Sequence, residues 1–231
     1  MPLSLALGAR FMAFDVVTFE LPFEDRSAQR ADRHGSARLR VGINASGLLF
    51  HQAETGANRY GLSIDYAAYT RGLIAALIAR GDEVHLVPHV RSAMLADDDD
   101  SSLRDRLHAE FPETVPVTDF PGPSEAKAYI SSLDFLVAGR MHACIGAVSA
   151  GTPVVPVAYS RKFGGLFGML GYDWMIPVTG MTTEQALAYT LEALDRRAEL
   201  AASEAAAMAK VTAKLDAYRA VLRSLFRDIR R

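Results

Sequence analysis

The sequence is poor in cysteine, because Cys144 is the only one among 231 residues. A single thiol supports neither a disulfide framework nor a thiolate metal cage, so a reducing compartment is expected. No apolar run reaches the length of a membrane span, and residues 1–10 lack the basic lead-in of a signal peptide. We therefore expect a cytoplasmic protein.

Other absences narrow the class of ligand. The formal net charge is −2, so there is no general basic field for a nucleic-acid backbone. No Gly-x-Gly-x-x-Gly fingerprint follows the first predicted strand, which argues against a dinucleotide cofactor. The run Asp97–Asp100 lacks the glycine and the spaced ligands of a calcium loop, so we expect a solvated loop there. We infer no metal site.

The chain alternates between apolar strands and helical segments. Predicted strands cover 39–44, 83–88, 114–119, 134–138 and 153–158, with a short last strand at 174–178. Predicted helices cover 63–80, 101–110, 142–150 and 163–170, and Ser124 is expected to cap another that runs to Ser131. Gly47, Gly56 and Asn58 are assigned to a loop. Apolar strands in this order indicate an α/β fold with a doubly wound, mostly parallel, Rossmann-like sheet.

The two ends of the chain differ from residues 38–180, which we predict to be the Rossmann-like domain. Residues 14–21 form a strand-like run, and the polar stretch 24–36 is expected to be a mobile linker. Residues 181–231 are rich in alanine and contain no proline, so one or two helices are predicted over 183–230. Those helices either clasp the domain or pair with another chain.

The segment from Leu136 to Pro153 is the most informative stretch. It predicts a buried strand, a glycine turn and a helix that begins near Arg140 and His142. The first N–H groups of a helix lack internal partners, so a guanidinium and an imidazole there favour an anion site. The alternative is a helix cap with a surface ion pair. Small residues let this helix lie close to the sheet, where Cys144 is expected to be packed rather than to act as a nucleophile.

Polar and titratable residues follow the first five predicted strands. Because ligands of open α/β sheets bind beyond the carboxyl ends of the strands, these residues are expected at one edge. Their surplus of cations predicts a small anion, either a phosphate or a carboxylate. Each residue also has a structural alternative, such as a turn, a cap or ordinary packing. The residues are Asn44, Ser46, Gly47, His89, Asp119, Arg140, His142, Tyr159, Arg161 and Lys162.

Four stretches resemble the polysaccharide pyruvyl transferase family: 41–47, 134–143, 151–153 and 159–165. The resemblance covers roughly residues 38–178. It implies a glycosyltransferase-B-like architecture, in which two Rossmann-like domains face a cleft and this chain supplies the second. Residues 14–22 look like the segment that leads out of the first domain, so 1–37 is expected to be a remnant of that domain and a linker.

The resemblance also implies an activity. Family members move a pyruvyl group from phosphoenolpyruvate to a sugar of a cell-surface polysaccharide, usually as a ketal, with phosphoenolpyruvate as donor and no further cofactor. Arg140 and His142 match the family's Arg-x-His pair, which is associated with phosphoenolpyruvate, and are the expected catalytic residues. The expected substrate-binding residues are Asn44, Ser46, Gly47, His89, Tyr159 and Lys162. The partners implied are the donor and a glycan acceptor.

We expect the guanidinium of Arg140 and the imidazole of His142 to project into one solvent-reachable pocket. The first Rossmann-like half is not found in this sequence, so a complete cleft is expected to need another chain. Two alternatives stay open. One is a nucleotide-sugar-dependent glycosyltransferase of the same architecture, and the other is a non-catalytic half-domain that binds a partner subunit.

Overall fold

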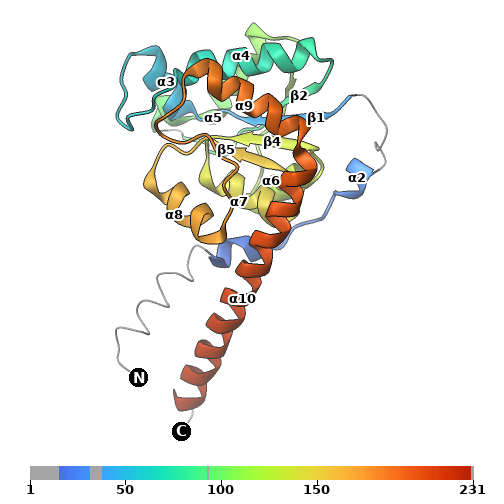
Figure 1. The fold of residues 1–231 in the computed structure, drawn as a ribbon, viewed down its shortest axis with the longest axis vertical. Helices are drawn as coiled ribbons and strands as arrows, with labels where there is room; N and C mark the ends of the chain where they lie inside the picture. The colour runs from blue at the N-terminus through green and yellow to red at the C-terminus, as the bar shows by residue number, and fades with distance from the viewer. Residues whose placement is uncertain (1–15, 32–37, 93, 230–231) are drawn as a thin grey trace.

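The computed structural model describes residues 16–31, 38–92 and 94–229. Its centre is a five-stranded, all-parallel sheet with the strand order β3-β2-β1-β4-β5 (Figure 1). The strands are β1 (Arg40–Asn44), β2 (Glu83–Leu86), β3 (Val115–Pro116), β4 (Phe135–Ala138) and β5 (Val154–Pro156). The chain winds outward from β1 to β3, returns to the centre at β4 and continues to β5. The predicted doubly wound, Rossmann-like fold is confirmed.

The strands are apolar because both faces of the sheet are covered. In β4, Phe135 and Val137 join one hydrophobic core, while Leu136 and Ala138 join the other. The first core is closed by α3 (Gly47–Glu54), α4 (Tyr66–Ala79), α5 (Asp100–Glu110) and α9 (Thr183–Asp195). The second core is closed by α6 (Pro123–Ser131), α7 (Met141–Ala150), α8 (Arg161–Leu170) and the first half of α10 (Arg197–Ile229).

Local signals place the ends of the helices. The side chain of Asp65 accepts a hydrogen bond from the backbone N–H of Ala68 at the start of α4, and Thr182 forms a capping box with Gln185 at the start of α9. Helix α7 ends at Gly151, whose φ of 64° lies in the left-handed region. Cys144 is fully buried in α7, which confirms that it is packed, and burial raises the pKa of its thiol.

Three local predictions are wrong. The segment that begins at Gly47 is expected to be a loop but forms helix α3. The prediction fails because Gly47 and Gly56, at the two ends of this segment, are interpreted as turn residues. Residues 174–178 do not form a strand, since only Ile176 makes a single bridge, to Val157, and Pro177 has no N–H for a ladder. Helix α6 is capped by Gly122 with Pro123 in its first turn, so Ser124 lies inside it.

The N-terminal segment packs on the domain. Residues 14 and 15 lie outside the described residues, and the rest of the expected strand is a helical turn with η1 (Thr18–Glu20) at its centre. This segment does not pair with a strand of the sheet. It instead buries Val16 and Phe19 against α7. The described part of the expected mobile linker is also docked, because the Arg26 N–H donates to Ser131 Oγ (2.9 Å) and Arg30 Nη1 donates to the Gly151 carbonyl (2.7 Å).

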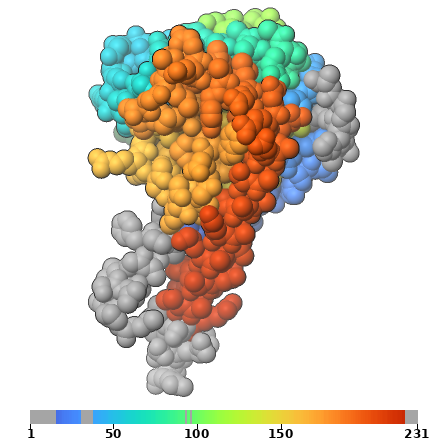
Figure 2. All heavy atoms as spheres, viewed as in Figure 1, coloured from blue at the N-terminus to red at the C-terminus, as the bar shows by residue number. Residues whose placement is uncertain are grey.

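The C-terminal part is two helices, as predicted. Helix α9 covers the sheet, and α10 packs along α7 and α8 before it extends beyond the α/β domain (Figures 1 and 2). Leu200, Ala207, Val211 and Leu215 are its buried contacts. In the part of the chain that the structure describes, no helix combines the length and the apolar character needed to span a bilayer.

A buried carboxyl group fastens α10 to the sheet. Glu204 is 1% exposed, its Oε1 accepts from the Val154 N–H at 3.0 Å, and its Oε2 has no partner among the described residues. Burial raises the pKa of Glu204 well above its ordinary value, against the lowering effect of the Val154 N–H and the Tyr172 hydroxyl. The folded chain therefore holds a proton that the unfolded chain releases above about pH 4.5.

This proton makes stability depend on pH. Its contribution is complete below the unfolded pKa and is lost as the pH rises through the folded pKa. We expect Glu204→Gln to flatten the decline in unfolding free energy between pH 5 and pH 8, measured by urea denaturation. Glu113→Gln, at an exposed position, is the matched control and should keep the wild-type slope. An equal slope in wild type and Glu204→Gln would contradict the assignment.

Candidate functional site

The centre of the carboxyl edge is the switch point between β1 and β4, where the strand order reverses. Asn44 is the last residue of β1, and its side chain forms hydrogen bonds to the segments that follow β2 and β4. Its Nδ2 donates to the Val87 carbonyl at 2.9 Å, and its Oδ1 accepts from the Arg140 N–H at 3.1 Å. Such crevices bind ligands in open α/β sheets. Here the crevice is filled by a side chain of the protein itself.

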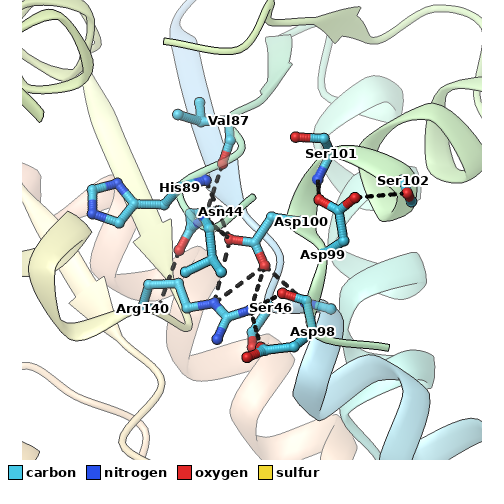
Figure 3. A network of polar contacts seen from close by, with 12 residues as sticks. Asn44, Ser46, Val87, His89, Asp98, Asp99, Asp100, Ser101, Ser102 and Arg140 are labelled. Atoms are coloured by element: carbon cyan, nitrogen blue, oxygen red, sulfur yellow. Dashed lines mark hydrogen bonds and ion pairs between the residues drawn. The ribbon is translucent and has the colours of Figure 1, made fainter. Parts of the chain in front are cut away.

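That side chain is Asp100, the first residue of α5, whose carboxylate is fully buried (Figure 3). Oδ1 accepts from the Gly47 N–H at 3.0 Å and from Arg140 Nη2 at 2.6 Å. Oδ2 accepts from the His89 N–H (3.2 Å), the Val90 N–H (2.9 Å) and Asn44 Nδ2 (3.3 Å). We call these donors the Asp100 cradle. The sequence predicts that these polar groups bind a small anion from solution, whereas in the structure they hold the carboxylate of Asp100.

The guanidinium of Arg140 is held by the Asp100 carboxylate. Its side chain is 9% exposed, and Nη2 also donates to Asp98 Oδ1 at 2.7 Å. Burial opposes the charge, yet hydrogen bonds and charges from Asp100 and Asp98 raise the pKa of Arg140 above its ordinary value. The acidic run is therefore not the solvated loop expected from its composition. Asp99 likewise accepts from the Ser101 N–H and caps α5.

Gly47 is required by the close approach of two backbones. A Cβ at this position would lie 2.8 Å from the carbonyl oxygen of Asp99, a backbone atom that cannot swing away. Gly47 therefore serves the Asp100 cradle. Ser46 beside it is fully buried and donates its N–H to the Tyr66 hydroxyl at 3.1 Å. Neither residue borders the two cavities described below.

We expect Gly47→Ala to lower the free energy of unfolding by about 1–3 kcal/mol, because the added methyl group forces α3 away from Asp99. Chemical denaturation followed by circular dichroism would measure the loss. Gly164→Ala is the control, since a Cβ there meets no atom within 4 Å. A Gly47→Ala protein as stable as the control would show that the helix shifts without cost.

His142 faces a different space from Arg140. It is exposed in the first turn of α7 and borders a cavity of about 420 Å³ whose wall also includes His89, Lys127, Thr18, Leu21 and Ile145. A neighbouring cavity of about 230 Å³ contains Asp119 and shares His89, Val90 and Pro123 with the first. The expectation of one solvent-reachable pocket for Arg140 and His142 is therefore wrong, because Asp98 and Asp100 hold the guanidinium.

His89 forms the wall between the two cavities. Its ring points away from the Asp100 carboxylate, although its backbone N–H belongs to the cradle (Figure 3). Among the described residues, Nδ1 is buried without a hydrogen-bond partner. Burial lowers the pKa of His89 to about 4, against the raising effect of the Asp100 carboxylate, and His142 and Arg140 add smaller lowering effects. The imidazole is thus neutral at physiological pH.

Two helices begin beside these cavities without a side-chain cap. Arg140 is the N-cap of α7 and Gly122 that of α6. A guanidinium has no acceptor and glycine has no side chain, so neither residue caps its helix through a side chain. Pro123 in the first turn of α6 borders both cavities, and His142 in α7 borders the larger one. The partial positive charge at these helix ends suits an anion.

The other predicted residues lie apart from this cavity. Tyr159 is half-buried, and its ring packs against Tyr60 at 4.8 Å and Phe163 at 5.3 Å between centroids. Lys162 is exposed in the first turn of α8. Neither borders the two cavities. Asp119 accepts from Ser101 Oγ and Arg104 rather than from the turn that follows it.

Sequence reasoning missed two groups. Asp100 could have been found from Asp99 and the serines after it, a pattern typical of a helix start. Lys127 is a buried lysine whose Nζ donates to the Phe19 and Leu21 carbonyls at 3.0 and 2.9 Å. Burial lowers the pKa of Lys127. The only sequence signal for the burial of Lys127 was the apolar helix face around it.

The structure does not gather metal ligands in the residues that it describes. His85 and His89 have a His-x-x-x-His spacing, but His85 instead contacts Glu83 Oε1 at 2.7 Å and the Tyr129 hydroxyl at 2.6 Å. The spacing spans the end of a strand rather than one face of a helix.

The structure is a Rossmann-like α/β domain with two adjoining cavities at the carboxyl edge of its sheet. A family model described as polysaccharide pyruvyl transferase matches residues 12–161, well over half of the chain. The chain belongs to the polysaccharide pyruvyl transferase family. A search of curated proteins found no match.

Proposed function

We propose that this chain binds phosphoenolpyruvate beside His142 and transfers its pyruvyl group to a sugar of a cell-surface polysaccharide. The observation that carries the proposal is the position of His142. In a pyruvyl transferase, it stands exposed on an uncapped helix start and borders a cavity of about 420 Å³. The helix end favours the phosphate or carboxylate, and the apolar walls suit the methylene group.

The proposed reaction forms a ketal and releases phosphate. The methylene carbon of phosphoenolpyruvate takes up a proton, and two sugar hydroxyls form bonds to the enol carbon. The bond from that carbon to the phosphate oxygen breaks. Of the two hydroxyl protons, one balances the proton on the new methyl group and the other leaves with the phosphate. His142 supplies the proton or holds the phosphate, because an imidazole ring has nitrogens that can donate and accept hydrogen bonds.

Arg140 has a positioning role in this proposal. Its charge is neutralised by Asp98 and Asp100, so it does not clamp the donor as the sequence predicted. Instead it fixes the start of α7, and with it His142, against the loop before α5. Tyr159 and Lys162 remain proposed contacts for a larger substrate that extends toward β5.

The test is product analysis with phosphoenolpyruvate and candidate glycans. The proposal predicts phosphate release that requires the glycan and a glycan that gains a pyruvyl ketal by mass spectrometry. Transfer from a nucleotide sugar would instead support a glycosyltransferase, and binding of a partner subunit without transfer would support a non-catalytic half-domain. The experiment is carried out under two conditions, with the chain alone and with a second chain that supplies the facing domain. We also propose a cytoplasmic location.

A further inference from the structure

The two ring nitrogens of His89 lie in different surroundings. Nδ1 is sealed and, among the described residues, has no hydrogen-bond partner. Nε2 also lacks a partner there but is not sealed, and the ring forms part of the wall of both cavities. Nε2 is therefore the nitrogen that a ligand can reach.

This geometry decides which nitrogen carries the proton. An imidazolium has an N–H on both nitrogens, and one at Nδ1 would be a buried donor without an acceptor. A neutral ring with its hydrogen on Nδ1 has the same fault. The ring with hydrogen on Nε2 avoids it, since a lone pair at Nδ1 leaves no donor unsatisfied.

The charged groups around His89 act in both directions. The Asp100 carboxylate favours a charged ring, but it accepts from the backbone N–H of His89 and is paired with Arg140, and burial of the ring outweighs it. The ring shares its cavities with groups of both signs, and none of them contacts Nδ1. These groups are His142 on α7, Lys127 on α6, Arg91 after β2 and Asp119 after β3.

We propose that His89 is an uncharged hydrogen-bond donor that uses Nε2–H to bind a carboxylate or phosphate oxygen of the donor substrate. This inference rests on the proposed function and specifies its site. His89 fixes the orientation of the substrate without exchanging a proton, which leaves the proton chemistry to His142. A fixed dipole also stays the same throughout the pH range in which an exposed histidine changes charge.

The first test uses nitrogen-15 NMR of the wild-type chain, with His89 assigned by comparison with His89→Gln. The expected result is one neutral form with hydrogen on Nε2, unchanged between about pH 5 and pH 8. Titration of His89 in that range, or hydrogen on Nδ1, would overturn the proposal. This measurement needs no turnover, so it stands apart from the test of the proposed function.

The second test adds phosphoenolpyruvate and compares two variants. Glutamine places an amide N–H near the position of Nε2, whereas leucine fills the space without a donor. We expect His89→Gln to keep the dissociation constant within about threefold, and His89→Leu to raise it about tenfold or more. Equal losses in both variants would overturn the donor role.

The outcomes separate the two ideas. In the wild type, phosphoenolpyruvate should shift the Nε2–H signal of His89. A response at His142 without one at His89 contradicts this inference alone. A chain in which no residue responds to phosphoenolpyruvate contradicts the proposed function, while the NMR form of His89 still tests whether the ring is the neutral donor.

Discussion

Asp100→Ala is expected to lower the free energy of unfolding by about 3–5 kcal/mol. The substitution leaves the guanidinium of Arg140 buried without its main counter-charge, because its side chain is only 9% exposed. It also leaves the N–H groups of Gly47, His89 and Val90 without an acceptor. Urea denaturation at neutral pH would measure the loss.

Asp97→Ala is the matched control, since that side chain belongs to the same acidic run but is 66% exposed. It should change stability by no more than about 0.5 kcal/mol. Asp100→Ala combined with Arg140→Ala should cost less than the sum of the single changes, because the double variant leaves no lone buried charge. Additive losses, or equal losses for Asp97 and Asp100, would refute the Asp100 cradle.

His142→Ala should reduce turnover by about 10²–10⁴-fold, the range that general acid catalysis supplies. The same change should leave the unfolding free energy within about 0.5 kcal/mol, because His142 is exposed and has no described role in either core. Steady-state phosphate release with phosphoenolpyruvate and an accepted glycan would measure the rate.

His108→Ala is the histidine control. This residue lies in the last turn of α5, at the other end of that helix from Asp100, where its Nδ1 contacts Thr114 Oγ1 at 3.1 Å. Its turnover should match that of the wild type. A competent enzyme that keeps its full rate after His142→Ala would show that another group delivers the proton.

The order of strands and helices could be predicted because its signals are local. Apolar strands separated by amphipathic helices indicate a parallel sheet, and Gly151 marks the end of α7. The same logic placed His89 and His142 at one edge, where they now share a cavity wall. It failed at α3, because Gly47 was interpreted as a turn residue although a close backbone contact requires it.

The burial of Arg140 against Asp98 and Asp100 could not be predicted from the residues beside it in the sequence. Its partners, Asp98 and Asp100, lie about 40 positions earlier, and an acidic run in sequence gives no sign of burial. Charge patterns report which groups attract an anion, but only tertiary packing decides whether that anion comes from the chain or from solution. The described N-terminal residues illustrate the same limit, since Lys127 and α7 hold them in place.

The most direct test of the account is a titration of the chain with phosphoenolpyruvate, followed by NMR of the histidine side chains. We expect saturable shifts at His142 and His89, no shift at His108, and weaker binding after His142→Ala. Unchanged affinity in His142→Ala, or shifts confined to other parts of the molecule, would contradict a donor site at the start of α7.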